Sequence, residues 1–310
     1  MSHIFDALQR AESESSGSEG PTISLATELL QAAERKIREA GAMVAAQTNG
    51  IDELCASADS SNAIPTAFPF GDLERCPVLQ VSIPQESHLV SAGKEESLGA
   101  EKFRFLAVRL RHIRQTRPLK KILITSTIPQ EGKSTVAANL ACTLARRKPQ
   151  KVLLLEGDLR RPTVAAQFGL GKIPGLCEWL SGQTEGINIC RLESLGLWVL
   201  TAGAAPQNPL ELMQSGKLSP LMDQLEAWFD WIVIDSPPVL PLADASMWSR
   251  LADGTLLVTR KGTTEKQQLR RGLDALEKSK LLGALVNSSS NASHSDYYQR
   301  YSSPSVNSKD

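Results

Sequence analysis

The stretch STIPQEGKST, residues 126–135, follows the apolar run Ile122–Ile124 and leads into the alanine-rich run 136–141. That order predicts a strand, a loop and a helix. A loop in this place can turn its backbone N–H groups inward, and the helix N-terminus adds the positive end of its dipole. The stretch therefore predicts a phosphate-binding turn at the centre of an α/β fold.

Three residues of this turn have the right chemistry for a nucleotide. Gly132 lets the backbone approach a phosphate, Lys133 can reach the β and γ oxygens, and Ser134 can ligate Mg²⁺. The strict pattern also requires glycine where Thr127 stands. An ordinary strand-to-helix turn with a surface lysine is therefore the alternative.

Composition limits the function classes. The 310 residues allow one sizeable domain with tails, or two domains. Lys+Arg and Asp+Glu are both 34, so the charge balance does not indicate a nucleic-acid partner. The five cysteines form no Cys-x-x-Cys pair, and free thiols in a reducing cytoplasm are the simplest account of them. No run is apolar enough to predict a membrane span, and no signal peptide is indicated.

The chain divides into three parts. Residues 1–96 are predicted to be largely disordered, with short amphipathic helices at 1–11 and 22–47. Residues 97–287 are predicted to form the folded domain, and residues 288–310 a flexible tail.

Strands and helices alternate within the predicted domain, which indicates a mostly parallel central sheet flanked by helices. A first helix is predicted over about 99–115, before the sheet begins. The predicted strands are 121–126, 151–156, 197–201, 231–235, 254–259 and 283–287. The predicted helices that follow are 132–147, 176–180, 209–213, 218–229, 243–251 and 265–279.

Two acids follow the second of these strands. Glu156 and Asp158 stand two residues apart at its carboxyl end, where ligands bind in an α/β sheet. Such a pair can orient Mg²⁺ or accept a proton from an attacking hydroxyl, and Arg160 or Arg161 can steady phosphate charge. A solvated loop with a salt bridge is the alternative.

A further acid ends the apolar run 231–234. Asp235 stands where P-loop enzymes place their second metal-holding carboxylate, so it can hold a Mg²⁺-bound water beside Ser134. An aspartate that begins a turn before two prolines explains the residue equally well. It does not explain why this strand lies downstream of a phosphate loop in the same predicted sheet.

All three tyrosines of the chain lie in its tail, at Tyr297, Tyr298 and Tyr301. Tyrosine usually serves as a buried amphipathic group, so its absence from the predicted domain needs a reason. The side chains are either phosphate acceptors or a short aromatic docking motif. The ten residues from Asn287 to Tyr297 span roughly 33–36 Å when extended, which allows a tyrosine to reach a neighbouring subunit.

These pieces together resemble the bacterial tyrosine kinases (BY-kinases) of exopolysaccharide and capsule systems, within the MinD/ParA-like P-loop ATPases. The resemblance covers about residues 97–301. The motifs that carry it are Gly132-Lys133-Ser134-Thr135, the run 156–162, Ala202-Gly203 with the run 208–212, the run 234–238 and the tyrosine tail.

The resemblance implies a P-loop NTPase fold and an ATP- and Mg²⁺-dependent protein-tyrosine autokinase that phosphorylates its tail in trans. Catalysis would use Lys133, Asp158, Glu156 and Asp235. ATP would contact Gly132, Lys133, Ser134, Thr135, Arg160 and, at the adenine base, Asn287. The residues Ser134, Asp235 and Asp158 would hold the metal.

The resemblance also implies partners. These are a membrane-embedded polysaccharide co-polymerase that activates the chain, further copies of the chain, and a cognate tyrosine phosphatase. A cytoplasmic chain recruited to the inner face of the membrane is expected. The face formed by Ile4, Phe5 and Leu8 and the helix at 22–47 are candidate contact points.

The chain departs from the family pattern at two informative places. Glu156 stands where relatives usually have aspartate. The assembly motif Glu-x-x-Arg-x-x-Arg is matched by Glu101 and Arg104, but its last place is Ala107, so assembly would be weaker or would use Arg109 or Arg111. Two alternatives stay open. One is a MinD/ParA-like organising ATPase, although the second lysine usual in that class is missing here, and the other is a non-catalytic ATP-binding regulator.

Overall fold

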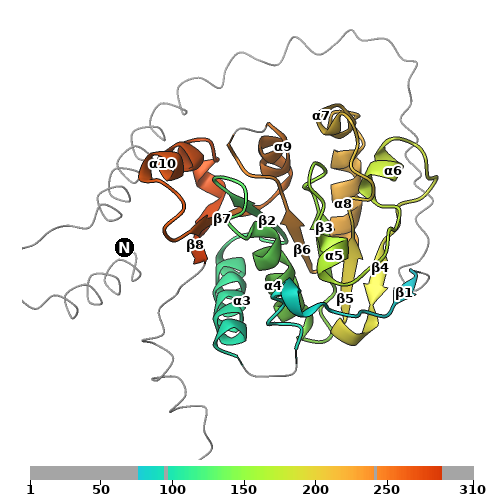
Figure 1. Ribbon diagram of the computed structural model, residues 1–310, viewed down its shortest axis with the longest axis horizontal. Coiled ribbons are helices and arrows are strands. Elements are labelled where there is room, and N and C mark those ends of the chain that lie inside the picture. The colour runs from blue at the N-terminus through green and yellow to red at the C-terminus, as the bar shows by residue number, and fades with distance from the viewer. Residues whose placement is uncertain (1–75, 94–96, 241–242, 288–310) are drawn as a thin grey trace, which may run out of the picture. The chain divides into compact units, whose positions relative to one another are not determined.

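The computed structural model describes residues 76–93, 97–240 and 243–287. Its centre is a sheet built mainly from the strands that the sequence predicts (Figure 1). Across the sheet the strands follow the order β1-β4-β5-β3-β6-β2-β7-β8, and the six from β5 to β8 are parallel. Their bounds are β1 Val78–Leu79, β2 Lys121–Ser126, β3 Val152–Glu156, β4 Cys190–Leu192, β5 Leu197–Leu200, β6 Trp231–Asp235, β7 Gly254–Arg260 and β8 Leu281–Asn287.

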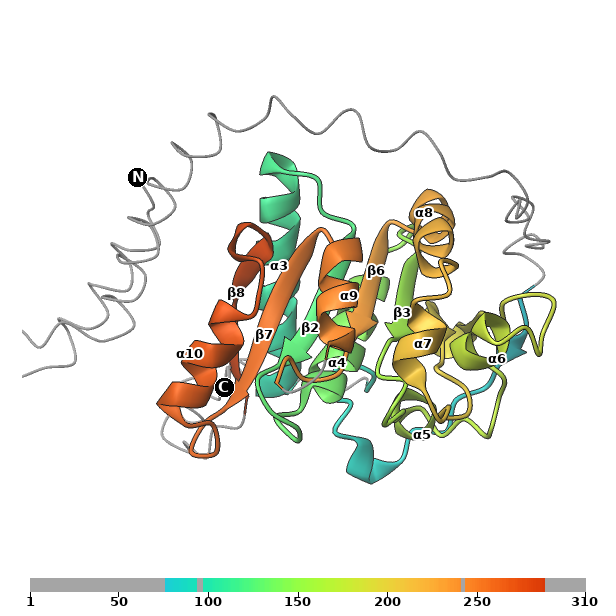
Figure 2. The ribbon, with the colours of Figure 1, turned by 90° about the horizontal axis from the view of Figure 1, so that it is seen from above.

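Helices cover both faces of this sheet (Figures 1 and 2). One face packs against α3, α4 and α5, and the other against α6, α7, α8 and α9. The bounds are α3 Leu98–Thr116, α4 Lys133–Ala145, α5 Val164–Gln167, α6 Leu176–Leu180, α7 Pro209–Met213, α8 Leu218–Trp228, α9 Asp244–Leu251 and α10 Lys266–Asp274, with short 3₁₀ helices η2 Gln85–Ser87, η3 Glu193–Leu195 and η4 Lys278–Lys280.

Strand periodicity explains the two layers. Ile122 and Ile124 of β2 face the α4 side of the sheet, whereas Leu123 between them faces the α8 side. A parallel sheet covered on both faces needs apolar residues at every position, which is why the strands read as continuous apolar runs. α4 is buried from Val136 to Ala145 between the sheet and α3, and its alanines permit this close packing.

The predicted fold class is confirmed, and each predicted strand is present. The sequence misses β1, β4 and α5, because two to four residues are too few to show a period. The helix predicted over 265–279 instead ends at Asp274.

Ordered structure begins before residue 97, which corrects, for residues 76–93, the expectation that residues 1–96 are largely disordered. β1 pairs with β4, and Leu89 is buried against the core. The Ser91 backbone N–H donates to Asn139 Oδ1 of α4 at 2.8 Å, and Asn139 Nδ2 donates to the His88 carbonyl at 3.0 Å. These contacts join residues about fifty positions apart, so local periodicity cannot reveal them.

The remaining terminal predictions lie outside the described residues. They include the helices at 1–11 and 22–47 and the tail at 288–310. The division of the chain into three parts thus stays a prediction. Within the described ranges, no helix has the length and apolar character needed to cross a membrane.

Candidate active site

Strand order brings the sequence motifs together. β6 lies between β2 and β3 in the sheet, and all three strands are parallel. Their carboxyl ends therefore carry the 126–135 loop, Asp235 and Glu156 at one edge. In register, Asp235 stands opposite Ile124 of β2 and opposite Glu156 of β3. A ligand at this edge would meet residues from three strands at once.

The loop has the backbone geometry of a tight anion-binding turn. Gly132 has φ +87°, in the left-handed region, and caps the N-terminus of α4. A Cβ at this position would lie 2.1 Å from Asn287 Nδ2, which itself donates to the Glu131 carbonyl at 2.9 Å. Both the backbone angle and the close approach of Asn287 thus require glycine. Asn287, the predicted adenine contact, lies beside the loop.

Glu131 braces the loop, a role that the sequence did not reveal. Its side chain is buried and accepts a hydrogen bond from the Ile128 N–H at 2.8 Å. The other carboxylate oxygen accepts from the Arg260 N–H at 3.3 Å and from the Thr264 hydroxyl. The loop is therefore tied to the end of β7. A signal was present, since an acid inside a phosphate loop is electrostatically unfavourable unless it is paired.

Lys133 is the charge centre of the site. Its Nζ lies 2.8 Å from Asp158 Oδ2, 3.9 Å from Asp235 Oδ1 and 3.3 Å from Ser134 Oγ. Burial acts to lower the pKa of Lys133, but the negative charges of Asp235 and Asp158 outweigh it and the pKa is raised. The lysine is therefore an ammonium at neutral pH, as phosphate binding requires.

Asp235 is a buried carboxylate without a hydrogen-bond donor. It is 0% exposed, and neither of its oxygens has a hydrogen-bond partner. Burial raises the pKa of Asp235 to about 7, although the charge of Lys133 and the nearby Ser134 hydroxyl, which does not complete a hydrogen bond of ordinary geometry, act in the opposite direction. Buried polar atoms are normally satisfied, so these oxygens fit a cation such as Mg²⁺.

The protein supplies only part of a metal shell. The described residues contain no group of three or more His, Cys, Asp or Glu side chains arranged to hold a metal ion. Magnesium in nucleotide sites is typically held by one or two carboxylates together with phosphate oxygens and water. Ser134 and Asp235 therefore fit a metal that arrives with the nucleotide.

Asp158 faces Lys133 because the turn after β3 is held from both sides. Its Oδ1 accepts from the Arg161 N–H at 3.2 Å. The Gly157 N–H donates to the Asp235 carbonyl at 2.7 Å, and Trp248 Nε1 donates to the Gly157 carbonyl at 2.9 Å. A Cβ at Gly157 would lie 2.6 Å from the Trp248 ring, so only glycine fits. Trp248 is a supporting residue that the sequence did not identify.

Glu156, predicted as a catalytic acid beside Asp158, accepts three backbone hydrogen bonds. One oxygen accepts from the N–H groups of Thr163 and Val164, the latter at 2.7 Å, and the other from the Ala202 N–H at 2.9 Å. Burial raises the pKa of Glu156, while these backbone hydrogen bonds act to lower it. The carboxylate is therefore occupied in joining β3 to α5 and to the strand end of β5.

Arg160 is also occupied. Its guanidinium donates to both oxygens of the buried Asp244, at 2.7 Å from Nε and 3.2 Å from Nη2. The side-chain hydrogen bond to Asp244 raises the pKa of Arg160. Its predicted contact with phosphate therefore competes with a bidentate ion pair.

Two further predictions concern Thr135 and the tail tyrosines, and the structure describes only the first of these. Thr135 follows Ser134 in the first turn of α4 and is half-buried there, close to the loop. The tyrosines at 297, 298 and 301 lie outside the described residues, so their part in the site stays a prediction.

Known proteins share this chain's sequence and fold. No protein-family model matches. The chain is 37% identical over 217 residues to the tyrosine-protein kinase YwqD of Bacillus subtilis, covering 68% of this chain and 90% of that protein. The kinase domain of the Escherichia coli tyrosine kinase ETK matches with a TM-score of 0.61 and 29% identity, over 70% of this chain and 84% of that one. The chimerical protein CapA2B2 matches with a TM-score of 0.60 and 32% identity, over 68% and 93%. The chain belongs to the family of bacterial tyrosine-protein kinases.

Proposed function

We propose that this tyrosine-protein kinase transfers the γ-phosphoryl group of ATP to tyrosines of its own tail, in a neighbouring copy of the chain. The observation that carries the proposal is the meeting of Lys133, Asp158 and Asp235 at the mouth of the 126–135 loop. When bound, ATP with Mg²⁺ supplies the phosphoryl group and a cation that offsets its charge.

The loop side of the site holds the phosphates. The Lys133 ammonium faces the developing negative charge, and the backbone N–H groups around Gly132 point to the same place. Ser134 and Asp235 hold the cation, which gives the Asp235 oxygens the partner that they lack. Positioning and charge supply most of the rate enhancement in phosphoryl transfer.

Asp158 accepts the proton of the attacking tyrosine. A free tyrosine hydroxyl has a pKa of about 10, so a nearby carboxylate favours its attacking form. Asp158 Oδ2 is held 2.8 Å from Lys133 Nζ. Once Lys133 turns toward the phosphates, this oxygen is released for the tyrosine. Glu156, with three backbone hydrogen bonds, positions the strand end and leaves the proton to Asp158.

Self-association brings the tail of one copy to the site of another. α3 presents Phe105 and Val108, which are 66% and 59% exposed, on its outer face. Ala107, the last place of the assembly motif, is buried and cannot take part, whereas Arg109 is exposed. Phe105→Glu should therefore reduce association, measured by light scattering, together with tail labelling.

A membrane-embedded polysaccharide co-polymerase is proposed as the activator, which would recruit the chain to the inner face of the membrane in exopolysaccharide or capsule production. A cognate tyrosine phosphatase would reverse the labelling. Both follow from the family resemblance. Stimulation of labelling by the cytoplasmic segment of such an activator would test the first.

One experiment tests the kinase assignment. The purified chain is incubated with ATP and Mg²⁺, and phosphate is mapped by mass spectrometry. Phosphate is expected on Tyr297, Tyr298 or Tyr301, and it should vanish in Lys133→Met and in the triple Tyr→Phe variant. Persistent labelling elsewhere would contradict the tail assignment. Release of free phosphate without labelling would favour an organising ATPase instead.

A further inference from the structure

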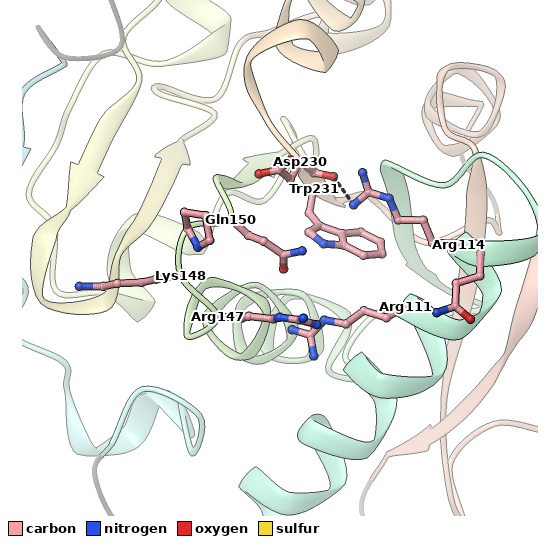
Figure 3. A pocket seen from close by; sticks show the side chains of 9 residues that line it. Arg111, Arg114, Arg147, Lys148, Gln150, Asp230 and Trp231 are labelled. Carbon is pink, nitrogen blue, oxygen red and sulfur yellow. Dashed lines mark hydrogen bonds between the residues drawn. The ribbon is translucent and has the colours of Figure 1, made fainter.

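A second, strongly basic pocket lies at the opposite end of the sheet from the active site (Figure 3). It has a volume of about 420 Å³, within the range of small-molecule sites. Its walls come from the C-terminal half of α3, the turn after α4 and the start of β6. The lining residues are Arg111, Arg114, Gln115, Arg147, Lys148, Pro149, Gln150, Asp230 and Trp231.

The distance between the two sites follows from α4. The helix begins at the phosphate loop and ends at Ala145, just before the pocket residues Arg147 and Lys148. Thirteen helical residues span about 20 Å. Trp231 and Asp235 likewise mark the two ends of β6. The pocket is therefore separate from the phosphate loop.

Three lining residues of the pocket contact one another and hold one another in place. Arg114 Nη1 donates to the Asp230 carbonyl at 2.9 Å, and its guanidinium lies 4.7 Å above the Trp231 ring. The Asp230 carboxylate accepts from the Lys151 N–H at 2.8 Å. The only acid among the lining residues therefore already has a partner.

Three cations remain without an acidic partner. In the described parts of the chain, no carboxylate lies within ion-pair distance of Arg111, Arg147 or Lys148. Figure 3 shows the guanidinium groups of Arg111 and Arg147 facing each other in the pocket. Burial and the positive charge of Arg147 lower the pKa of Arg111. Two guanidinium groups that face each other repel, and an anion between them would offset this repulsion.

Three residues that line the pocket also have buried polar atoms without a hydrogen-bond partner. Arg111 Nε, Gln150 Oε1 and the buried Trp231 Nε1 have no hydrogen-bond partner. Two of these atoms are donors, and Arg111 is only partly exposed. Buried donors without a partner are uncommon in folded proteins, and they are explained when a ligand accepts from them.

We propose that this pocket is a binding site for a phosphate group, carried either by a free polyphosphate or by a phosphorylated tyrosine side chain. Arg111 and Arg147 would each donate paired N–H groups to phosphate oxygens, which is the geometry that guanidinium groups favour. Lys148 also lines the pocket, although its ammonium extends away from the two arginines (Figure 3). The pocket lies apart from the phosphate loop, and its occupation by a phosphorylated tyrosine rests on the kinase function proposed above.

Binding is measured by isothermal titration calorimetry on the full chain, with the phosphate loop saturated by ADP and Mg²⁺ to remove competition. The probes are inorganic pyrophosphate and O-phospho-L-tyrosine, and L-tyrosine is the control that lacks the phosphate group. The test variant is Arg111→Gln with Arg147→Gln. The matched control is Arg270→Gln, because Arg270 is an exposed arginine of α10 that does not line the pocket.

At least one phosphate probe should bind the native chain and the Arg270→Gln control equally. The double variant should lose at least tenfold in affinity, and binding should weaken as salt is raised. Tighter binding of pyrophosphate would identify the ligand as a free polyphosphate. Tighter binding of phosphotyrosine would identify it as a phosphorylated tyrosine side chain. The proposal fails if neither probe binds, or if the double variant, verified as folded by circular dichroism, binds as the native chain does.

Discussion

Two buried carboxylates lie opposite each other in register at the ends of β3 and β6, and their surroundings differ completely. Glu156 accepts three backbone hydrogen bonds, whereas Asp235 accepts none. Both are 0% exposed. Burial alone therefore does not separate a functional acid from a structural one. The hydrogen-bond partners differ, since the Glu156 carboxylate joins elements of the fold, whereas the unsatisfied Asp235 fits the cation site proposed above.

The largest effect is expected from Asp235→Asn. The amide removes the charge that holds the cation, and tail labelling should fall about 100- to 1000-fold, as for other electrostatic contacts in a transition state. The free energy of unfolding without nucleotide should stay the same or rise, because a buried unpaired charge is removed. Radiolabelled phosphate incorporation and urea denaturation measure the two quantities. A variant that loses stability and keeps its activity would reverse the assignment of the two acids.

A pH dependence of stability should follow from Asp235. Burial raises its pKa to about 7 from an unfolded value of about 3.9, so the native state binds more protons between these values. Stability from this group is therefore present at low pH and is lost as pH rises toward 7, by an amount on the order of 2–4 kcal/mol. Urea denaturation from pH 4 to 8 measures this.

The matched comparison is the difference in the free energy of unfolding between the native chain and Asp235→Asn. That difference should grow with rising pH and level off above about 7. A constant difference over this range would mean that Asp235 is ionised throughout, with a hidden partner. The affinity of the native chain for ATP with Mg²⁺ should rise with pH over the same range, because the ionised carboxylate is the form that holds the cation.

Glu156→Gln should lower stability with little effect on nucleotide affinity. Its amide NH₂ would face backbone N–H donors, which leaves at least one of them unsatisfied at a cost of about 1–3 kcal/mol. Urea denaturation measures the loss, and nucleotide titration provides the second readout. Glu156→Asp restores the family's usual acid and is the sharper control. If Glu156→Asp raises tail labelling severalfold, the acid at this position takes part in catalysis.

Much of this site could be predicted from the sequence. The phosphate loop, Asp158 and Asp235 each stand at the end of an apolar run, and parallel strands carry such ends to one edge. The partners of these residues were not predictable. Glu131 bonds to residues about 130 positions away, and Trp248 supports Gly157 from 91 positions away. Contacts over such separations are set by strand order, which local patterns do not specify.

The same limit applies to Glu156 and to the basic pocket. As a residue type, Glu156 fits catalysis and structure equally, and only the N–H groups around it decide. The arginines of the pocket come from two helical segments, Arg111 on α3 and Arg147 after α4. Their meeting depends on how those helices pack, so the pocket has no signature in the sequence.

The smallest effect is expected at a third buried acid, Asp244, whose partner is the more exposed Arg160. Arg160→Gln leaves the Asp244 carboxylate without its ion pair, but water can reach the site, so the stability loss should be about 1 kcal/mol. Arg160→Lys keeps the charge but loses the bidentate geometry, and it should recover part of this loss. Tail labelling decides whether Arg160 also contacts phosphate. A fall of less than threefold in Arg160→Gln means that Asp244 retains the guanidinium during the reaction, and a fall above tenfold means that Arg160 leaves Asp244 for the nucleotide.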